Sequence, residues 1–422
     1  ENYIPVSTQN ELQNLFSTTT FGIGTPYEAE YLGGPDKNYI MTNDIELTGE
    51  FTPLGDTSSN RFSGIFNGGG YTISNLTLDD ASSDVGLFVN IENATISSVR
   101  INGFVDEIDA IYFGIIAGQA YGNMLISDVA IVNVDFTVNN NAGGLIGRLN
   151  RDNSMNELRK IYRSSVKGNL SNTNANNSNF GGLIGTQNYG VLEIVQSYYD
   201  GNILQEEAPR NGGLIGAVEN STQKVVIEKS FTVGTIEGGT DFNAVGVGGM
   251  IGYVNSHDEI IVEITDSYST MIVISADNSD AAGGFIGKWR DVSKGEAIIT
   301  NSIYIGEVIA STGDVFHYEQ ASTEFSNTFT INDSYFHGIT SSAQTYSLNS
   351  LAYADLIDIN NYANWDIESY SGNNSSTWVI GYEDDSGSSI DSMPWLAWQE
   401  EPAILKNVET TETSDLVNNQ SF

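Results

Sequence analysis

The sequence of 422 residues contains no cysteine, and only 16 of its residues are lysine or arginine. Without cysteine the chain has no disulfide, no thiolate ligand for zinc and no thiol nucleophile. No apolar run approaches the roughly 18 residues of a membrane-spanning helix, so we expect no membrane insertion. No signal peptide is visible, but the chain opens at Glu1 rather than Met, which is compatible with a leader that has already been removed.

Acidic residues dominate the charge: 54 aspartates and glutamates give a formal net charge of −38. Such a surface repels nucleic acid and anionic lipid, so neither is an expected partner. It suits salty or calcium-rich surroundings, and it keeps a large exported protein soluble. The hydrophobic share of 40% is enough for a continuous core, so we expect a folded chain.

What the sequence has in abundance is glycine in a repeated block. The pentapeptide GGLIG begins at Gly143, Gly181 and Gly212, and its variants GGMIG and GGFIG begin at Gly248 and Gly283. Successive blocks start 38, 31, 36 and 35 residues apart, and weaker forms precede them in the N-terminal third. This spacing indicates a repeat architecture rather than several unrelated domains.

A second marker advances along the chain at nearly the same pace. It is a serine followed by a mostly apolar pair, with glycine usually four residues after the serine. Its copies begin at Ser164, Ser197, Ser230, Ser267, Ser302 and Ser334. Six copies in register indicate a stacked hydroxyl ladder or a turn hydrogen bond, because a catalytic serine needs one copy and an adjacent base.

A period of 20–50 residues is typical of solenoids, propellers and arrays. The segments between the markers are rich in Ile, Val, Thr and Tyr and show no helical periodicity. Most intervals are too short for a propeller blade, which needs about 40–45 residues. We therefore predict an all-β protein, a right-handed parallel β-helix of about nine coils over residues 61–340.

In this fold the glycines are expected at corners that need either a positive φ or a close approach of backbones. The central Leu, Met or Phe of each block is predicted to lie in the core. The adjacent isoleucine is apolar as well. Either a loop therefore covers the outer face of the strand, or the strand ends there.

Both ends of a β-helix expose strand edges, so we expect caps. Residues 1–60 are predicted to form a short helical cap and the opening strands, with Thr8 and Glu11 at capping-box spacing. Residues 341–404 contain four of the five tryptophans and are predicted to plug the C-terminal end. The polar residues 405–422 are expected to be a tail or linker.

The recurrent G-G-[LMF]-I-G block, followed by a strand of the form I-x-[ND]-S-[YF]-x-x-G, resembles the GLUG-motif repeats of bacterial surface proteins. The stretches 39–47, 51–55 and 61–78 are similar to the opening module that such proteins often have, and the blocks of the N-terminal third depart from the pattern. The resemblance implies a secreted or cell-attached, adhesin-like β-helix. No catalytic residue belongs to the motif, so none is assigned.

Two groups of charged residues are candidate sites. Six basic residues lie close together in the sequence: Arg148, Arg151, Arg159, Lys160, Arg163 and Lys167. On so acidic a chain they predict a local positive patch, which binds an acidic glycan or another copy, or pairs with acids of neighbouring coils. The best candidate for a Ca²⁺ site is an acidic loop that contains Glu383, Asp384, Asp385 and Asp391, although it lacks the spacing of a calcium loop.

These features favour an exported surface or extracellular-matrix protein, an adhesin-type stalk or binding module without catalysis. Its expected partners are a surface glycan, other cells or proteins, or further copies of itself. One alternative is a polysaccharide lyase or glycoside hydrolase, which would bring three or more charged or tyrosine side chains together with perturbed pKa values. A second alternative is a subunit of a self-assembling extracellular filament.

Overall fold

The computed structural model describes the chain in segments. These are residues 3–17, 33–57, 59–151, 157–172, 178–205, 210–238, 246–256, 259–275, 281–290, 295–309, 312–314, 317–319, 328–332, 334–336, 349–350, 356–362, 364–371, 374–383, 389–390 and 392–399. Residues 405–422 and the predicted calcium ligands Asp384, Asp385 and Asp391 lie outside them, as does the side chain of Glu383.

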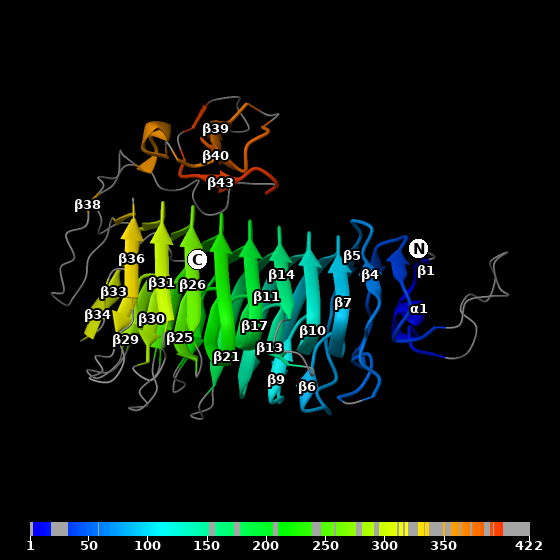
Figure 1. Ribbon diagram of the computed structural model, residues 1–422. Helices are drawn as coiled ribbons and strands as arrows, with labels where there is room; N and C mark the ends of the chain where they lie inside the picture. The colour runs from blue at the N-terminus through cyan, green and yellow to red at the C-terminus, as the bar shows by residue number, and fades with distance from the viewer. Residues whose placement is uncertain are drawn as a thin grey trace.

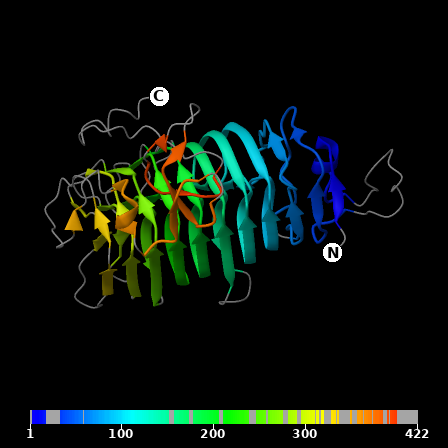
Figure 2. The ribbon, with the colours of Figure 1, turned by 90° about the horizontal axis from the view of Figure 1, so that it is seen from above.

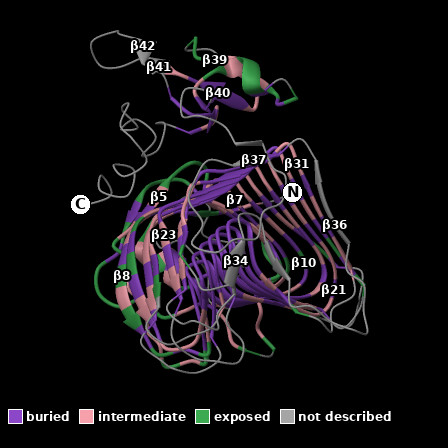
Figure 3. Cartoon of the chain, turned by 90° about the vertical axis from the view of Figure 1, so that its left-hand side faces the viewer, coloured by how far each residue is buried: buried purple, intermediate pink, exposed green. Residues whose placement is uncertain are grey.

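The chain winds into a right-handed parallel β-helix whose coils stack along one axis (Figure 1). Each coil contributes strands in turn to a first, a second and a third sheet, as β7, β8 and β9 do in one coil. Buried residues recur in every coil of the shaft (Figure 3), and their side chains form one hydrophobic core. Among the described residues, eight coils have a strand in the third sheet, close to the nine that we expected.

The first sheet contains β1 (Ile4–Val6), β2 (Tyr39–Met41), β4 (Ile65–Asn67), β7 (Phe88–Ser97), β10 (Ala117–Ser127), β13 (Ile146–Asn150), β14 (Leu158–Tyr162), β17 (Ile184–Val195), β21 (Ile215–Glu228), β25 (Ile251–Ser256), β26 (Ile260–Thr265), β30 (Ile286–Trp289), β31 (Gly295–Thr300), β35 (His317–Glu319) and β36 (Thr328–Asn332). The second contains β3 (Ile45–Glu46), β5 (Thr72–Ser74), β8 (Arg100–Ile108), β11 (Ala130–Val138), β15 (Ser165–Asn172), β18 (Tyr198–Asp200), β19 (Ile203–Gln205), β22 (Phe231–Val233), β23 (Thr235–Gly238), β27 (Tyr268–Ser269), β28 (Ile272–Ser275), β32 (Ile303–Tyr304), β33 (Val308–Ile309), β37 (Tyr335–Phe336) and β38 (Asn349–Ser350). The third contains β6 (Asp84–Val85), β9 (Tyr112–Gly114), β12 (Asn141–Gly143), β16 (Asn179–Gly181), β20 (Arg210–Gly212), β24 (Gly246–Gly248), β29 (Ala281–Gly283) and β34 (Thr312–Asp314).

The glycine blocks lie directly over one another, as their period predicts. The first glycines form one column through the third sheet: Gly143, Gly181, Gly212, Gly248 and Gly283 are paired in register. At the second glycine, for example Gly182 or Gly213, an added Cβ would come closer than 3.0 Å to a carbonyl oxygen of the next coil. None of the block glycines has a positive φ. Close approach of backbones, not a left-handed conformation, therefore requires glycine here.

The two apolar residues that follow these glycines are both buried because the strand ends before the first of them and the next strand begins at the second. β12 ends at Gly143 and β13 begins at Ile146, so Leu145 lies in the corner that joins the third and first sheets. The Leu145 N–H donates to the Leu183 carbonyl of the next coil at 2.9 Å. Of the two arrangements left open by the sequence, the strand end is the correct one.

The serine column forms the predicted ladder. The N–H of each serine donates to the Oγ of the serine one coil further on, at 3.1 Å from Ser197 to Ser230 and from Ser230 to Ser267. Each Oγ donates in turn to the carbonyl two residues before it, at 2.9 Å from Ser197 to Val195. These hydroxyls are structural, because both their donor and their acceptor capacity are used within the backbone.

The N-terminal cap is present as predicted. Helix α1 (Gln9–Gln13) begins with the capping box of Thr8 and Glu11. Leu12 and Leu15 are buried, and the Phe16 ring lies 6.1 Å from that of Phe62 in the opening coils. An apolar helix face therefore covers the first open edge of the solenoid.

The tryptophan-rich segment is not a plug over the last coil, and this part of our prediction was wrong. It contains the 3-10 helix η1 (Ile359–Tyr362) and two small sheets, one of β39 (Ile367–Ser369), β40 (Trp378–Ile380) and β43 (Trp395–Leu396), the other of β41 (Tyr382–Glu383) and β42 (Ser389–Ile390). This C-terminal module, residues 356–399, folds back over the outer face of the second sheet (Figures 1 and 2).

An aromatic strip on the second sheet explains this position. The residue after each ladder serine faces outward, and in three successive coils it is Tyr198, Phe231 and Tyr268, with ring centroids 4.6 and 4.9 Å apart. The Trp378 ring lies 6.1 Å from Phe231 and 5.6 Å from Tyr268. Burial of these rings against the strip stabilises this position of the module more than packing at the end of the shaft would, because the tryptophans would meet fewer aromatic neighbours there.

Candidate functional site

Three of the six predicted basic residues form ion pairs between neighbouring coils. Lys160 Nζ lies 3.1 Å from the Glu193 carboxylate, and Lys167 Nζ lies 3.9 Å from that of Asp200. Arg163 pairs with Asp128 of the preceding coil. This is the arrangement in which basic residues neutralise acids of adjacent coils. The Lys160 and Arg163 pairs are exposed or half-buried and contribute little to stability, whereas Asp200 is buried.

Arg159 is not on the surface at all. It lies in an inward-facing column of the first sheet, between Met124 of the preceding coil and Leu192 of the next, and it is fully buried. Its guanidinium pairs with the buried carboxylate of Glu157. Burial lowers the pKa of Arg159 to about 10, and the Glu157 charge partly offsets this. Arg159 therefore belongs to the core and not to a binding patch.

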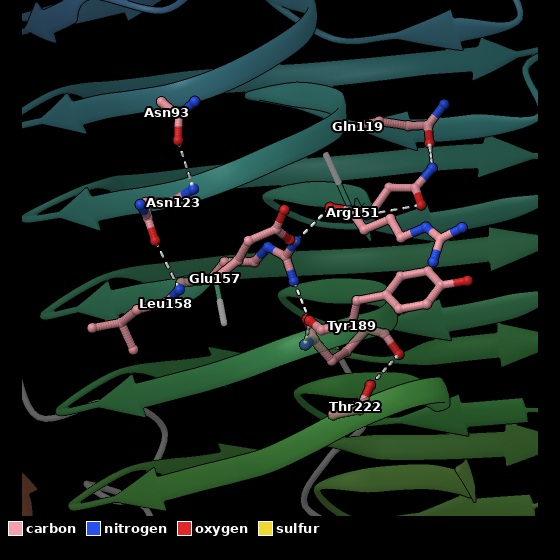
Figure 4. A network of polar contacts seen from close by, with 11 residues as sticks. Asn93, Gln119, Asn123, Arg151, Glu157, Leu158, Tyr189 and Thr222 are labelled. Atoms are coloured by element: carbon pink, nitrogen blue, oxygen red, sulfur yellow. Dashed lines mark hydrogen bonds and ion pairs between the residues drawn. The ribbon is translucent and has the colours of Figure 1, made fainter. Parts of the chain in front are cut away.

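The guanidinium of Arg159 also binds carbonyl groups of the first sheet. β13 ends at Asn150 and β14 begins at Leu158, and both strands pair with β10 and β17 on either side. Arg159 donates to the carbonyls of Asn150 and of Tyr189 in the next coil (Figure 4). The guanidinium thus donates to two carbonyl oxygens, of which that of Tyr189 also accepts from the Gln187 amide at 2.6 Å.

Arg148 and Arg151 lie on the outer side and belong to a larger group. We call it the arginine–tyrosine face, and it consists of Arg61, Tyr112, Tyr121, Arg148, Arg151, Tyr189, Arg210, Tyr253 and Arg290. These side chains come from the outer surfaces of the first and third sheets and the adjoining turns, from β9 in one coil to β30 in another. Each tyrosine of the face is covered by an arginine of the same face.

At the N-terminal part of the face, the Arg61 guanidinium lies 3.6 Å from the centre of the Tyr121 ring and 3.2 Å from the Glu92 carboxylate. One coil further on, Arg148 donates to the Tyr112 hydroxyl at 2.6 Å. Guanidinium groups stacked on rings are held in place at little entropic cost, because the planar group is already rigid.

In the middle of the face, Arg151 is exposed and lies 4.9 Å from the centre of the Tyr189 ring (Figure 4). At the C-terminal part, Arg210 pairs with Glu219 and lies 4.4 Å from the centre of the Tyr253 ring. Arg290, directly after β30, is exposed and also interacts with Tyr253.

Amide side chains connect these positions. The Asn188 amide, oriented with its oxygen toward the guanidinium, accepts from Arg148 at 2.8 Å, and it lies 2.7 Å from the Asn220 amide of the next coil. The Asn150 amide donates to Gln119 at 3.2 Å, and Gln119 donates to the buried Asp84 carboxylate at 2.8 Å. The face therefore offers neutral donors and acceptors between its cationic groups.

The charge of the face is opposite to that of the chain as a whole. Among the described residues, its five arginines stand against the three carboxylates that contact the group, Asp84, Glu92 and Glu219. The whole sequence has a net charge of −38. A local positive surface on such a protein favours anionic or hydrogen-bonding ligands at this place.

The chemistry of the face suits binding better than proton transfer. Burial raises the pKa of Tyr121 and of Tyr253, and the nearby arginines only partly offset this, so both phenols stay protonated at neutral pH. The described part of the chain has no group of three or more potential metal ligands. The convergence of side chains expected of a polysaccharide-cleaving enzyme is met in part, because arginines and tyrosines of several coils come together on this face.

Sequence reasoning missed Arg61, Arg210, Arg290 and the tyrosines. A signal was nevertheless present, because the face follows positions that flank the glycine block. Tyr112 and Arg210 each lie two residues before its first glycine, and Arg148 and Tyr253 each directly follow its last.

Comparisons with known proteins give limited information. No protein-family model matches the chain, and no curated protein matches it. Among solved structures, a Bacteroides ovatus protein provisionally named an immunoglobulin A1 protease matches with a TM-score of 0.43 and 14% identity, over 94% of this chain and 93% of that chain. A likeness at this level is no argument about activity. No helix among the described residues has the length and apolarity to cross a membrane.

Proposed function

We propose that this protein is an exported, non-catalytic binding protein, an adhesin-type stalk that holds a surface glycan on its arginine–tyrosine face. The observation on which this depends is the continuous set of arginine, tyrosine and amide side chains along several coils of a rigid shaft. Tyrosine and arginine give large contact areas and directional hydrogen bonds at low entropic cost, so binding surfaces favour them. Several such contacts on one shaft add up to useful avidity.

The polar side chains of the serine ladder and of the face already have partners within the protein, which supports a role without catalysis. The ladder serines bond within the backbone, and the tyrosines of the face are covered by arginines. Glu92 and Glu219 are paired with arginines, so neither is a free nucleophile or base. The resemblance to GLUG-motif repeats agrees with a secreted or cell-surface location.

A glycan-array screen with and without Ca²⁺, followed by chromatography of each bound glycan after prolonged incubation, tests the proposal. We expect binding and no new products. The double variant Arg148→Gln/Arg210→Gln should lose binding, whereas Lys160→Gln/Lys224→Gln removes the same charge outside the face and should keep it. Circular dichroism verifies that both variants fold. Depolymerisation of a bound glycan would instead establish the alternative of a polysaccharide lyase or hydrolase.

A further inference from the structure

We infer that the ligand of the arginine–tyrosine face is a carboxylate-bearing polysaccharide that lies along the shaft and spans Arg151 and Arg290. This inference rests on the proposed function and adds the chemical class and the orientation of the ligand. It excludes a small sugar and a neutral glycan as the preferred ligand.

The positions of the two exposed arginines set the length of the ligand. Arg151 directly follows β13 and Arg290 directly follows β30, and the strand register places Arg290 in line with Asn150, the residue before Arg151. The two strands are four places apart in the sheet order β13-β17-β21-β25-β30. At about 4.8 Å per coil the two positions are roughly 19 Å apart along the axis. A single molecule that reaches both must therefore be an extended chain.

The chemistry of the two ends calls for carboxylates. Among the described residues neither Arg151 nor Arg290 has a carboxylate partner, unlike Arg61 and Arg210, which are paired with Glu92 and Glu219. A guanidinium binds a planar carboxylate through two parallel hydrogen bonds, a geometry that a hydroxyl group does not match. Within the described part of the chain the two guanidinium groups therefore meet no carboxylate, so an acidic group of a ligand can pair with each of them.

The surface between the two arginines suits sugar hydroxyls. The Tyr189 ring lies beside Arg151, and the half-buried Asn220 and Asn255 lie on the coils that follow. Amides both donate and accept, as hydroxyl-rich chains require. A saccharide unit advances along its chain by about the rise of one coil, so successive sugars meet successive coils in the same way.

Nucleic acid is disfavoured because of its charge density. Duplex DNA has about one charge per 1.7 Å of axis, and the −38 protein repels it. A uronate chain has at most one charge per sugar. At physiological ionic strength the screening length is about 8 Å, so acids outside the face oppose such a chain only weakly. A second copy of this acidic chain is a different partner, and the test below separates it.

The test uses calorimetry with oligogalacturonates of increasing length and with their methyl-esterified counterparts. We expect long acidic chains to bind, the shortest to bind far more weakly, and esterification to lower affinity about tenfold or more. Arg151→Gln and Arg290→Gln should each lower affinity for long chains by about tenfold, and neither should affect the shortest chains much. Lys160→Gln alone is the charge-matched control for each single variant and should bind as the unmodified protein does.

Each other outcome overturns a distinct statement. Equal affinity for acidic and esterified chains means a neutral-glycan face, which removes this inference and leaves the proposed function intact. Concentration-dependent dimers in light scattering that Arg151→Gln/Arg290→Gln abolishes mean that the face binds a second copy. Absence of binding to every glycan tested removes the proposed function itself.

Discussion

Removal of the buried guanidinium of Arg159 tests directly how much the buried ion pair contributes to stability. Arg159→Met fills the same inward-facing position with an apolar side chain between Met124 and Leu192. The variant leaves the Glu157 carboxylate buried without its arginine, and it leaves the carbonyls of Asn150 and Tyr189 without this donor. We expect a loss of about 3–5 kcal/mol in the free energy of unfolding, the cost of breaking a buried ion pair from one side.

A second variant separates the charge from the packing. Arg159→Met/Glu157→Gln removes both charges, so the remaining cost comes mainly from the Asn150 carbonyl that lacks this donor, about 1–3 kcal/mol, because the Tyr189 carbonyl still accepts from the Gln187 amide at 2.6 Å. The double variant should be more stable than Arg159→Met alone. A solenoid need not unfold in one step, so denaturant midpoints should be combined with hydrogen exchange of β13, β14 and β17. An Arg159→Met protein as stable as the unmodified one, with unchanged exchange, would refute the role given to this pair.

Three further predictions concern the shaft and the C-terminal module. Phe231→Ala should weaken docking of the module by about 3–5 kcal/mol because it empties the centre of the aromatic strip, and faster limited proteolysis of residues 356–399 would show it. Burial raises the pKa of Asp200 above 3.8, more than Lys167 lowers it, so the charged form destabilises the fold. Asp200→Asn should therefore stabilise the protein at neutral pH, and unfolding curves should converge as pH falls below the folded-state pKa. Gly213→Ala places a Cβ against the Gly249 carbonyl and should cost about 1–3 kcal/mol in denaturant unfolding.

The fold could be predicted because every coil needs the same types of residue at the same positions. Each coil needs a residue without Cβ beside the next backbone, as at Gly182 and Gly213, and a hydroxyl that bridges two coils, as at Ser197 and Ser230. Such needs recur at a fixed period, so the printed sequence displays them. The strand end at Leu145 belongs to the same group, although the sequence alone left two arrangements open.

What could not be predicted depends on contacts that occur once. The position of Trp378 against Phe231 and Tyr268 is a long-range contact, and no local pattern indicates it. Arg159 faces inward in register with Met124 and Leu192, in a core column where hydrophobic alternation predicts an apolar residue. Within the arginine–tyrosine face, partners such as Arg61 and Tyr121 lie far apart in sequence and become neighbours only once the coils are aligned.

The aromatic strip also limits how this protein can change in length. The outward column of the second sheet is polar or small at Arg100, Ala130 and Ser165, and becomes aromatic at Tyr198, where the C-terminal module begins to cover it. Duplication or loss of a whole coil on the N-terminal side of Ser165 would leave the covered surface intact. The same event between Tyr198 and Tyr268 would move the rings of the strip relative to the module and break their contacts. Insertions and deletions among relatives should therefore accumulate in the first half of the shaft.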